Sequence, residues 1–153
     1  MATTEKRSTY HYKASGLDNV ILENVVIRNE GEEDEMVLLP RIEELHRVIA
    51  LGILTAPSCM SGKELRFLRT EMGLTQEELG ATLPAAVTRK TVNEWETGKS
   101  DITSNMEFVL RQLIAERLKL KLKLTPSELA EMCGCSAETR QIRIDTKDMK
   151  IAA

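Results

Sequence analysis

The chain of 153 residues is 42% apolar and 29% charged, a globular composition long enough for one domain or two small ones. It has no run of about 18 apolar residues, so we expect no membrane-spanning helix and a cytoplasmic protein. The net charge of −3 argues weakly against binding to nucleic acid, but residues 56–124 alone hold more basic side chains, 11, than acidic ones, 9.

The N-terminal third has the pattern of a small antiparallel sheet followed by a helix. β-Branched residues alternate within residues 10–28, and a further strand is expected at residues 36–39. The acidic segment 30–35 should be a solvated turn, or else a contact for a basic partner. A helix should begin at Pro40, since proline suits the first helical position. Its apolar stripe would be Ile42, Leu45, Ile49 and Ile53.

Residues 55–61 look like a linker to a unit of short, capped helices. In a capping box, a serine or threonine is followed three positions later by glutamate. The side chain of each residue accepts a hydrogen bond from the backbone N–H of the other. Two such boxes are Ser61 with Glu64 and Thr75 with Glu78. Gly73 should end the first of these helices and Pro84 the second.

A third helix is expected over residues 89–97, capped by Thr88 and stopped by Gly98. Val92 and Trp95 are three positions apart and would face inward, which leaves polar side chains on the outer face. A packed helix, a turn and a helix with a polar outer face have the layout of a helix-turn-helix, whose last helix enters the DNA major groove. The alternative is an ordinary helical bundle with a solvated charged face.

The polar side chains of this unit are the candidate DNA contacts. Arg89 and Lys90 could pair with guanine O6 and N7, and Asn93 with adenine. Glu94 could accept a hydrogen bond from cytosine N4, or it could exclude phosphates and set the register. Gln76, at the N-terminus of the preceding helix, is placed to hold a phosphate. Further candidates for contacts to the DNA backbone are Thr75, Thr88, Thr91, Thr97 and Lys99.

A long helix should follow, opened by Ser104 with Glu107 as a capping box. Its apolar face would be Met106, Val109, Leu110, Leu113, Ile114 and Leu118. Residues 118–124 alternate leucine and lysine, which suits a strand, but no breaker separates them from the helix. We therefore favour a helix with lysine stems lying along its surface. The lysines would form a solvated face, or they would touch phosphates or flank a dimer interface.

The C-terminal segment should hold a short helix and a strand. Thr125 with Glu128 forms another capping box, and the helix should reach Cys133. Residues 141–145 alternate like a closing strand that could pair with the N-terminal sheet. Cys133 and Cys135 are too close in sequence for a zinc pair, so we expect reduced thiols, with a redox role as the alternative.

Residues 61–98 resemble the Xre-type helix-turn-helix of phage repressors and bacterial regulators. The matching residues are Leu65, Arg66, Arg69, Gly73, Leu74, Thr75, Gln76, Leu79, Thr91, Val92, Trp95, Glu96 and Gly98. The resemblance implies a contact from Gln76 to the DNA backbone and base-facing positions for Arg89, Lys90 and Glu94.

The same resemblance implies a buried salt bridge between Arg69 and Glu96 that serves as scaffold. Two features depart from the family pattern: the turn at residues 83–87 is longer than usual, and Gly80 replaces a common alanine. Both affect how the third helix is held.

A wider resemblance, up to about residue 118, is to the MqsA or YgiT-type antitoxin group. It rests on Tyr10, Tyr12, Ser15, Gly16, Leu17, Asn19, Val20, Leu22, Asn24, His46, Ile49, Ala50, Gly62, Glu64, Arg66, Phe67, Leu68 and Arg69. Members pair an N-terminal part, often zinc-binding, with an Xre-type domain; they dimerise, repress their own operon and bind a toxin. Residues 1–55 lack Cys-x-x-Cys and contain only His11 and His46 as histidines, so the zinc site of that group cannot form.

We expect no metal, no cofactor and no enzymatic activity. His11 lies between Tyr10 and Tyr12 in sequence, but no nucleophile or second base stands at a telling spacing from it. A lone histidine on a strand is more often structural than catalytic.

The expected fold is α+β and mainly α. An N-terminal sheet-and-helix module (1–55) precedes a five-helix Xre-type, lambda-repressor-like domain (56–124) and a C-terminal helix and strand (125–153). The expected function is sequence-specific repression by a homodimer on a palindromic operator, with half-sites roughly 34 Å apart, at the nucleoid. The N-terminal module would neutralise a toxin, making the chain the antitoxin of a type II pair that represses its own operon. Alternatively, in a stand-alone Xre-family regulator, it would dimerise or sense a ligand.

Overall fold

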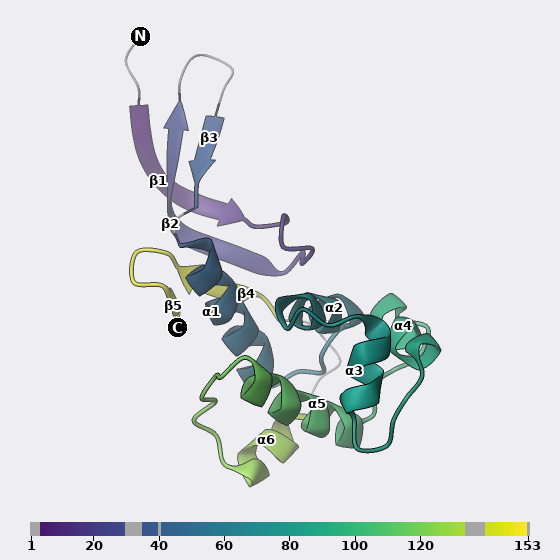
Figure 1. Cartoon of the computed structure of the whole chain (residues 1–153). Coiled ribbons are helices and arrows are strands. Elements are labelled where there is room, and N and C mark those ends of the chain that lie inside the picture. Colours follow the sequence, from purple (N-terminus) through teal and green to yellow (C-terminus); the bar gives the residue numbers. More distant parts are fainter. Residues whose placement is uncertain (1–3, 30–34, 40, 134–139, 153) are drawn as a thin grey trace.

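The structure is a computed structural model that describes residues 4–29, 35–39, 41–133 and 140–152. Helices make up most of the regular structure and form one body, from which a β-sheet arm projects (Figure 1). The expected α+β, mainly α class is confirmed. Among the described residues, no helix is long and apolar enough to cross a membrane.

The strands form one mixed sheet rather than the purely antiparallel one we expected. They are β1 (Thr4–His11), β2 (Val20–Asn29), β3 (Glu35–Leu38), β4 (Ile142–Asp145) and β5 (Lys150–Ile151). β2 pairs antiparallel with β1 along one edge; its other edge pairs with β3 in one half and, in parallel, with β4 in the other. The C-terminal strand thus completes the N-terminal sheet, and β5 extends it.

A bulge at Asn24 divides the long strand β2 into two halves. Asn24 has a positive φ of 60°, and the pairing with β1 shifts between Ser8 and Tyr10. The extra residue moves the buried positions from Val20 and Leu22 to Val25 and Ile27, and bulges bend strands in this way. The first half of β2 packs with the helical body, and the second half belongs to the projecting arm (Figure 1).

The described helices follow the predicted order. They are α1 (Ile42–Thr55), α2 (Gly62–Glu71), α3 (Gln76–Thr82), α4 (Arg89–Thr97), α5 (Ser104–Arg117) and α6 (Pro126–Cys133). Both predicted capping boxes before α2 and α3 are formed, with Ser61 and Thr75 as the N-caps. Residues 56–124 hold four helices, and α6, which packs against α5, supplies a fifth from beyond that range.

The start of α1 differs from the prediction. The helix begins at Ile42, with Arg41 as its N-cap at a φ of 49°, two residues later than expected. Leu45, Ile49 and Ile53 are buried as predicted, but Ile42, in the first turn, is 41% exposed. Pro40 and residues 30–34 of the acidic segment lie outside the described residues.

The expected linker after α1 is fixed by a buried arginine of α5. The Arg111 guanidinium donates hydrogen bonds to the backbone carbonyls of Leu54 and Ala56, at 3.1 and 3.0 Å, and to that of Ser58. Its Nη2 also pairs with the Glu107 carboxylate at 2.7 Å, and both side chains are almost fully buried. Buried carbonyls that accept no hydrogen bond within a helix or between strands thereby gain the guanidinium as a donor.

Glu107 has a different role from the capping box that we predicted with Ser104. The N-cap of α5 is Thr103, whose hydroxyl accepts a hydrogen bond from the Met106 N–H. The Glu107 carboxylate instead accepts from the Met60 N–H at 2.7 Å. The inner face of α5 is therefore shifted: Leu110 and Ile114 are buried as expected, together with the ion pair. Three residues predicted to be on the apolar face, Met106, Val109 and Leu113, are only half-buried.

The predicted continuation of α5 through residues 118–124 is wrong. The helix ends at Arg117, and Lys119 takes a positive φ of 55°. The Arg47 guanidinium of α1 donates to the carbonyls of Leu118 and Lys119, at 2.7 and 3.3 Å, which satisfies the open end of the helix. The extended segment that follows packs Leu120 and Leu122 against the core and exposes its lysines.

A chain of hydrogen bonds joins the sheet to two helices. His46 of α1 pairs through Nδ1 with Glu71 of α2 at 2.7 Å and through Nε2 with the Tyr12 hydroxyl at 2.9 Å. Burial is the main cause that raises the Tyr12 pKa, followed by the Glu71 carboxylate, so the phenol stays protonated. We interpret this group as structural. The buried apolar residues of the sheet and of α1, α2 and α5 form one continuous cluster.

Replacing Arg111 should strongly destabilise the protein. We expect Arg111→Met to lower the free energy of unfolding by about 3–5 kcal/mol, because Glu107 is left buried without its counter-charge. Arg111→Lys should also be destabilising, since an ammonium group lacks the forked geometry that serves several acceptors at once. Urea denaturation measures both effects. Arg117→Met, at the exposed end of the same helix, is the control, and its free energy of unfolding should lie within about 0.5 kcal/mol of wild type. Equal stability of the Arg111 and Arg117 variants would contradict the structural role of Arg111.

The buried carboxyl of Glu64 predicts a pH dependence. Its pKa is raised, mainly by burial, although Ser61 and Asn19 hydrogen bonds oppose the shift. A raised folded-state pKa contributes stability that is fully present below the ordinary value of 4.5 and is lost as pH rises through the folded value. Glu64→Gln, which keeps an acceptor but cannot ionise, should therefore gain stability relative to wild type as pH rises.

Denaturation of both proteins from about pH 4 to about pH 8 tests this. Glu78→Gln is the matched control, because Glu78 plays the same capping role at an exposed site. If the difference in free energy of unfolding between wild type and Glu64→Gln stays constant over this range, the pKa of Glu64 is not raised by folding.

Candidate nucleic-acid interface

The helix α4 has the two faces that the sequence predicted. Val92 is fully buried and Trp95 is 8% exposed, so both face the interior. Thr88 caps the helix by accepting the Thr91 N–H, and Gly98 ends it with a φ of 80°, a left-handed conformation that favours glycine. The outer face of α4 is thus presented by a helix fixed at both ends.

The four predicted base-facing residues differ in their freedom. Arg89, Lys90 and Asn93 are exposed. Glu94 is half-buried, and its carboxylate accepts a hydrogen bond from the Ser100 hydroxyl at 3.2 Å. This contact ties Glu94 through Oε2 to the segment after α4; the contact with cytosine and the register-setting role both remain predictions.

The ion pair implied by the family resemblance is present. Arg69 of α2 forms a two-pronged pair with Glu96 of α4, with Nε to Oε2 at 2.7 Å and Nη2 to Oε1 at 3.0 Å. The Glu96 side chain is 3% exposed. The hydrogen bond to Glu96 is the main cause that raises the Arg69 pKa, so the guanidinium stays charged. Arg69 also donates to the Leu74 carbonyl at 2.9 Å, which connects α2, the turn and α4.

Gln76 joins the same network instead of pointing freely outward. Its side-chain amide donates to Glu96 Oε1 at 3.3 Å, and the residue is half-buried. In this position, the first residue of α3 is oriented by the ion pair. A contact from Gln76 to a DNA phosphate remains a prediction; the donors that could make it are the backbone N–H and the second N–H of the side-chain amide.

The other predicted backbone contacts lie around the rim of this surface. Thr75 and Thr88 are exposed and serve as N-caps of α3 and α4, so each stands where helix N–H groups are available to phosphates. Thr91 is half-buried beside Thr88, with their hydroxyl oxygens 3.2 Å apart. Thr97 donates to the Asn93 carbonyl at 2.9 Å, and exposed Lys99 lies past the end of α4.

One residue of this surface was missing from the predicted contacts. Arg66 of α2 is exposed and helps to line a hollow of about 210 Å³ between α2, α3 and α4. The other lining residues are Arg69, Gln76, Asn93, Glu96 and Thr97. The available signal was its spacing: Arg66 precedes Arg69 by three positions and therefore shares its side of the helix.

The long turn between α3 and α4 passes directly over Gly80. A Cβ atom at this position would overlap the carbonyl oxygen of Val87, whose N–H donates to the Gly80 carbonyl at 3.1 Å. The longer turn and the glycine at position 80, the two departures from the family pattern, are therefore connected. The turn can approach α3 this closely only because Gly80 has no side chain.

Comparison with known families identifies the class of domain. Residues 65–106 match a family model described as "Helix-turn-helix", the Xre-family type. The chain thus carries an Xre-family helix-turn-helix domain and is a DNA-binding transcription regulator. No curated protein and no solved structure matches the chain.

The described residues contain no group of three or more histidine, cysteine, aspartate or glutamate side chains that could hold a metal ion. Cys133 is buried at the end of α6, and Cys135 lies outside the residues that the structure describes. His11, the other histidine of the N-terminal module, lies 2.5 Å from the Asp18 carbonyl through Nε2.

Replacing Glu96 should destabilise the domain. We expect Glu96→Ala to cost about 2–3 kcal/mol, because Arg69 keeps its charge in a mostly buried position and Gln76 loses its acceptor. Thermal and urea denaturation measure the loss. Glu77→Ala on the exposed face of α3 is the control; if the two variants unfold together, the ion pair contributes nothing to the scaffold.

Proposed function

We propose that this regulator is a sequence-specific repressor that binds a palindromic operator as a homodimer. The observation that carries the proposal is the outer face of α4, where Arg89, Lys90 and Asn93 are exposed on a helix held by the Arg69–Glu96 pair. Side chains that read base edges need such a rigid support, because a small displacement breaks their two-point hydrogen bonds. The protein would act in the cytoplasm, associated with the nucleoid, and would have no catalytic role.

For the N-terminal module we propose the antitoxin role, with autoregulation of a toxin–antitoxin operon. The support is the projecting arm of β1, β2 and β3, whose far end stands clear of the helices (Figure 1). Met36 on this arm is 48% exposed, and Val37 and Leu38 beside it are half-buried. We expect the arm to contact the toxin through this edge, with Met36 in the interface.

A second candidate function has its own support. A pocket of about 460 Å³ lies between the loop at residues 14–16 and α2. It favours the alternative of a stand-alone regulator whose N-terminal module senses a ligand.

The test of the proposed function is an anisotropy titration of the full chain against its own upstream promoter across a salt series. Specific repression requires tight binding that survives excess random DNA, and a footprint should show two half-sites about 34 Å apart. Weak binding that is equal on all DNA would contradict it. Co-expression with the products of the genes adjacent to this one tests the antitoxin role, which requires rescue of growth from a toxic product and a complex that depends on the arm.

Arg89 should specify one base. We expect Arg89→Ala to cost about 1–3 kcal/mol on the operator and to relax base preference at a single position. Lys99→Ala is the contrasting variant: as a phosphate contact, it should weaken binding to all sequences alike and lower the salt slope by about one. Binding of Arg89→Ala to a set of single-base operator variants measures the difference. A uniform loss would make Arg89 a phosphate contact and the assumed register wrong.

A further inference from the structure

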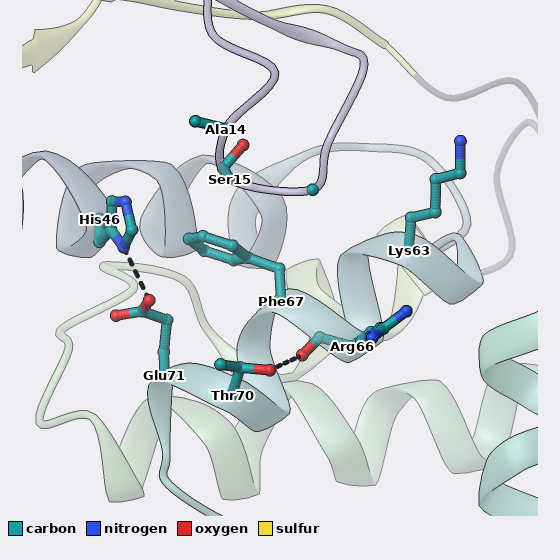
Figure 2. Close-up of a pocket in the computed structure, with 9 residues that line it drawn as sticks. Ala14, Ser15, His46, Lys63, Arg66, Phe67, Thr70 and Glu71 are labelled. Carbon is teal, nitrogen blue, oxygen red and sulfur yellow. Dashed lines mark hydrogen bonds and ion pairs between the residues drawn. The ribbon is translucent and has the colours of Figure 1, made fainter.

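The pocket beside α2 has a charged end and a hydrogen-bonding end. Figure 2 shows Lys63 and Arg66 on one side, with His46 and Glu71 on the other and Phe67 between them. The residues from α2 recur at intervals of three and four, so they share one face of the helix. The helix α4 contributes no residue to the lining of this pocket.

The loop wall and the His46 end of the pocket are fixed before any ligand arrives. The opposite wall is a tight loop in which Gly16 has a φ of 87° and the Ser15 hydroxyl donates to the Tyr12 carbonyl at 3.2 Å. At one end, His46 is held between the Tyr12 hydroxyl and the Glu71 carboxylate. Because these groups need little further ordering, binding would lose little conformational entropy.

The basic end is suited to a phosphate. No described residue accepts a hydrogen bond or ion pair from the Arg66 guanidinium, whose fork can bind two oxygens of one anion. Lys63 pairs with Asp18 at 3.1 Å, but both side chains are more than half exposed, and such surface pairs contribute little. The ammonium group can therefore turn to a dianion beside Arg66.

The other end is suited to hydroxyl groups. Glu71 Oε1 accepts from His46, and no described residue donates to Oε2. A carboxylate repels a second anionic group but accepts hydrogen bonds from hydroxyls. Taking both ends together, we propose that the pocket binds a sugar phosphate, with its phosphate on Lys63 and Arg66 and a hydroxyl group on Glu71.

Such a ligand would change DNA binding through Arg66, a consequence that rests on the proposed DNA-binding function. Arg66 lines both this pocket and the hollow between α2, α3 and α4. A phosphate in the pocket would draw the guanidinium away from the DNA side, where it is placed to meet a DNA phosphate. The sugar phosphate would therefore weaken operator binding and act as an inducer.

The test is calorimetric titration of the full chain with glucose 6-phosphate, and separately with inorganic phosphate and with glucose, at constant ionic strength. We expect glucose 6-phosphate to bind at least about tenfold more tightly than either part alone. Arg66→Gln should weaken it by about tenfold or more. Ala14→Trp, which fills the pocket from the exposed loop, should abolish binding, whereas Lys121→Gln on a distant exposed segment should not.

Operator titrations with and without glucose 6-phosphate complete the test. The ligand should weaken operator binding by wild type but not by Ala14→Trp, whose operator affinity without ligand should match wild type. Absence of heat with glucose 6-phosphate, in a protein that still binds its operator, would overturn the pocket and leave the proposed function standing. Equal affinity for inorganic phosphate would overturn the contact with Glu71. Ligand binding that leaves operator affinity unchanged would overturn the coupling through Arg66.

Discussion

The buried guanidinium of Arg111 is the constraint on which the rest of the structure depends. It supplies donors to carbonyls at the end of α1 and in the segment after it, and it neutralises Glu107 within the same helix. Glu107 in turn accepts from the backbone just before α2. A short stretch of irregular chain is thereby fixed between three helices, so the sheet-bearing part and the helix-turn-helix cannot tilt independently.

The helix α2 carries this rigidity to the DNA-binding surface. Its N-terminus meets the end of α4 so closely that Gly62 has no room for a side chain next to the Trp95 and Glu96 carbonyls. Two turns further on, Arg69 pairs with Glu96, and at the end of the helix Glu71 pairs with His46 of α1. The same ten-residue helix thus contacts α4 on one side and the N-terminal module on the other, so the proposed ligand pocket and the proposed DNA-binding surface share one element.

Local chemistry explains what could be predicted from the sequence. Capping boxes, a stop at Gly98 and the inward pair Val92 and Trp95 depend on residues a few positions apart, so their patterns are visible in the chain. The Arg69–Glu96 pair needed the family resemblance, because its partners stand on separate helices. Arg111 was missed, since an arginine four residues after a glutamate usually belongs to an exposed helix face.

Other features could not be predicted because distant residues decide them. The alternation of residues 141–145 indicated a strand that could pair with the N-terminal sheet, but the parallel direction of β4 beside β2, between residues about 120 positions apart, was not visible in the sequence. The leucine and lysine alternation of residues 118–124 fits either a helix or an extended segment, and the contact of Arg47 on α1 with the carbonyls just past α5 is not visible in the sequence. Likewise, His46 had no visible partner until folding brought Tyr12 and Glu71 to its two ring nitrogens.

The close approach of Val87 to Gly80 has a consequence for the evolution of such domains. While the turn keeps its present length and path, position 80 can hold only glycine, because even a methyl group would displace the Val87 carbonyl. Shortening the turn would remove that restriction and admit alanine. The two changes are therefore coupled, and among related sequences turn length and the residue at this position should vary together.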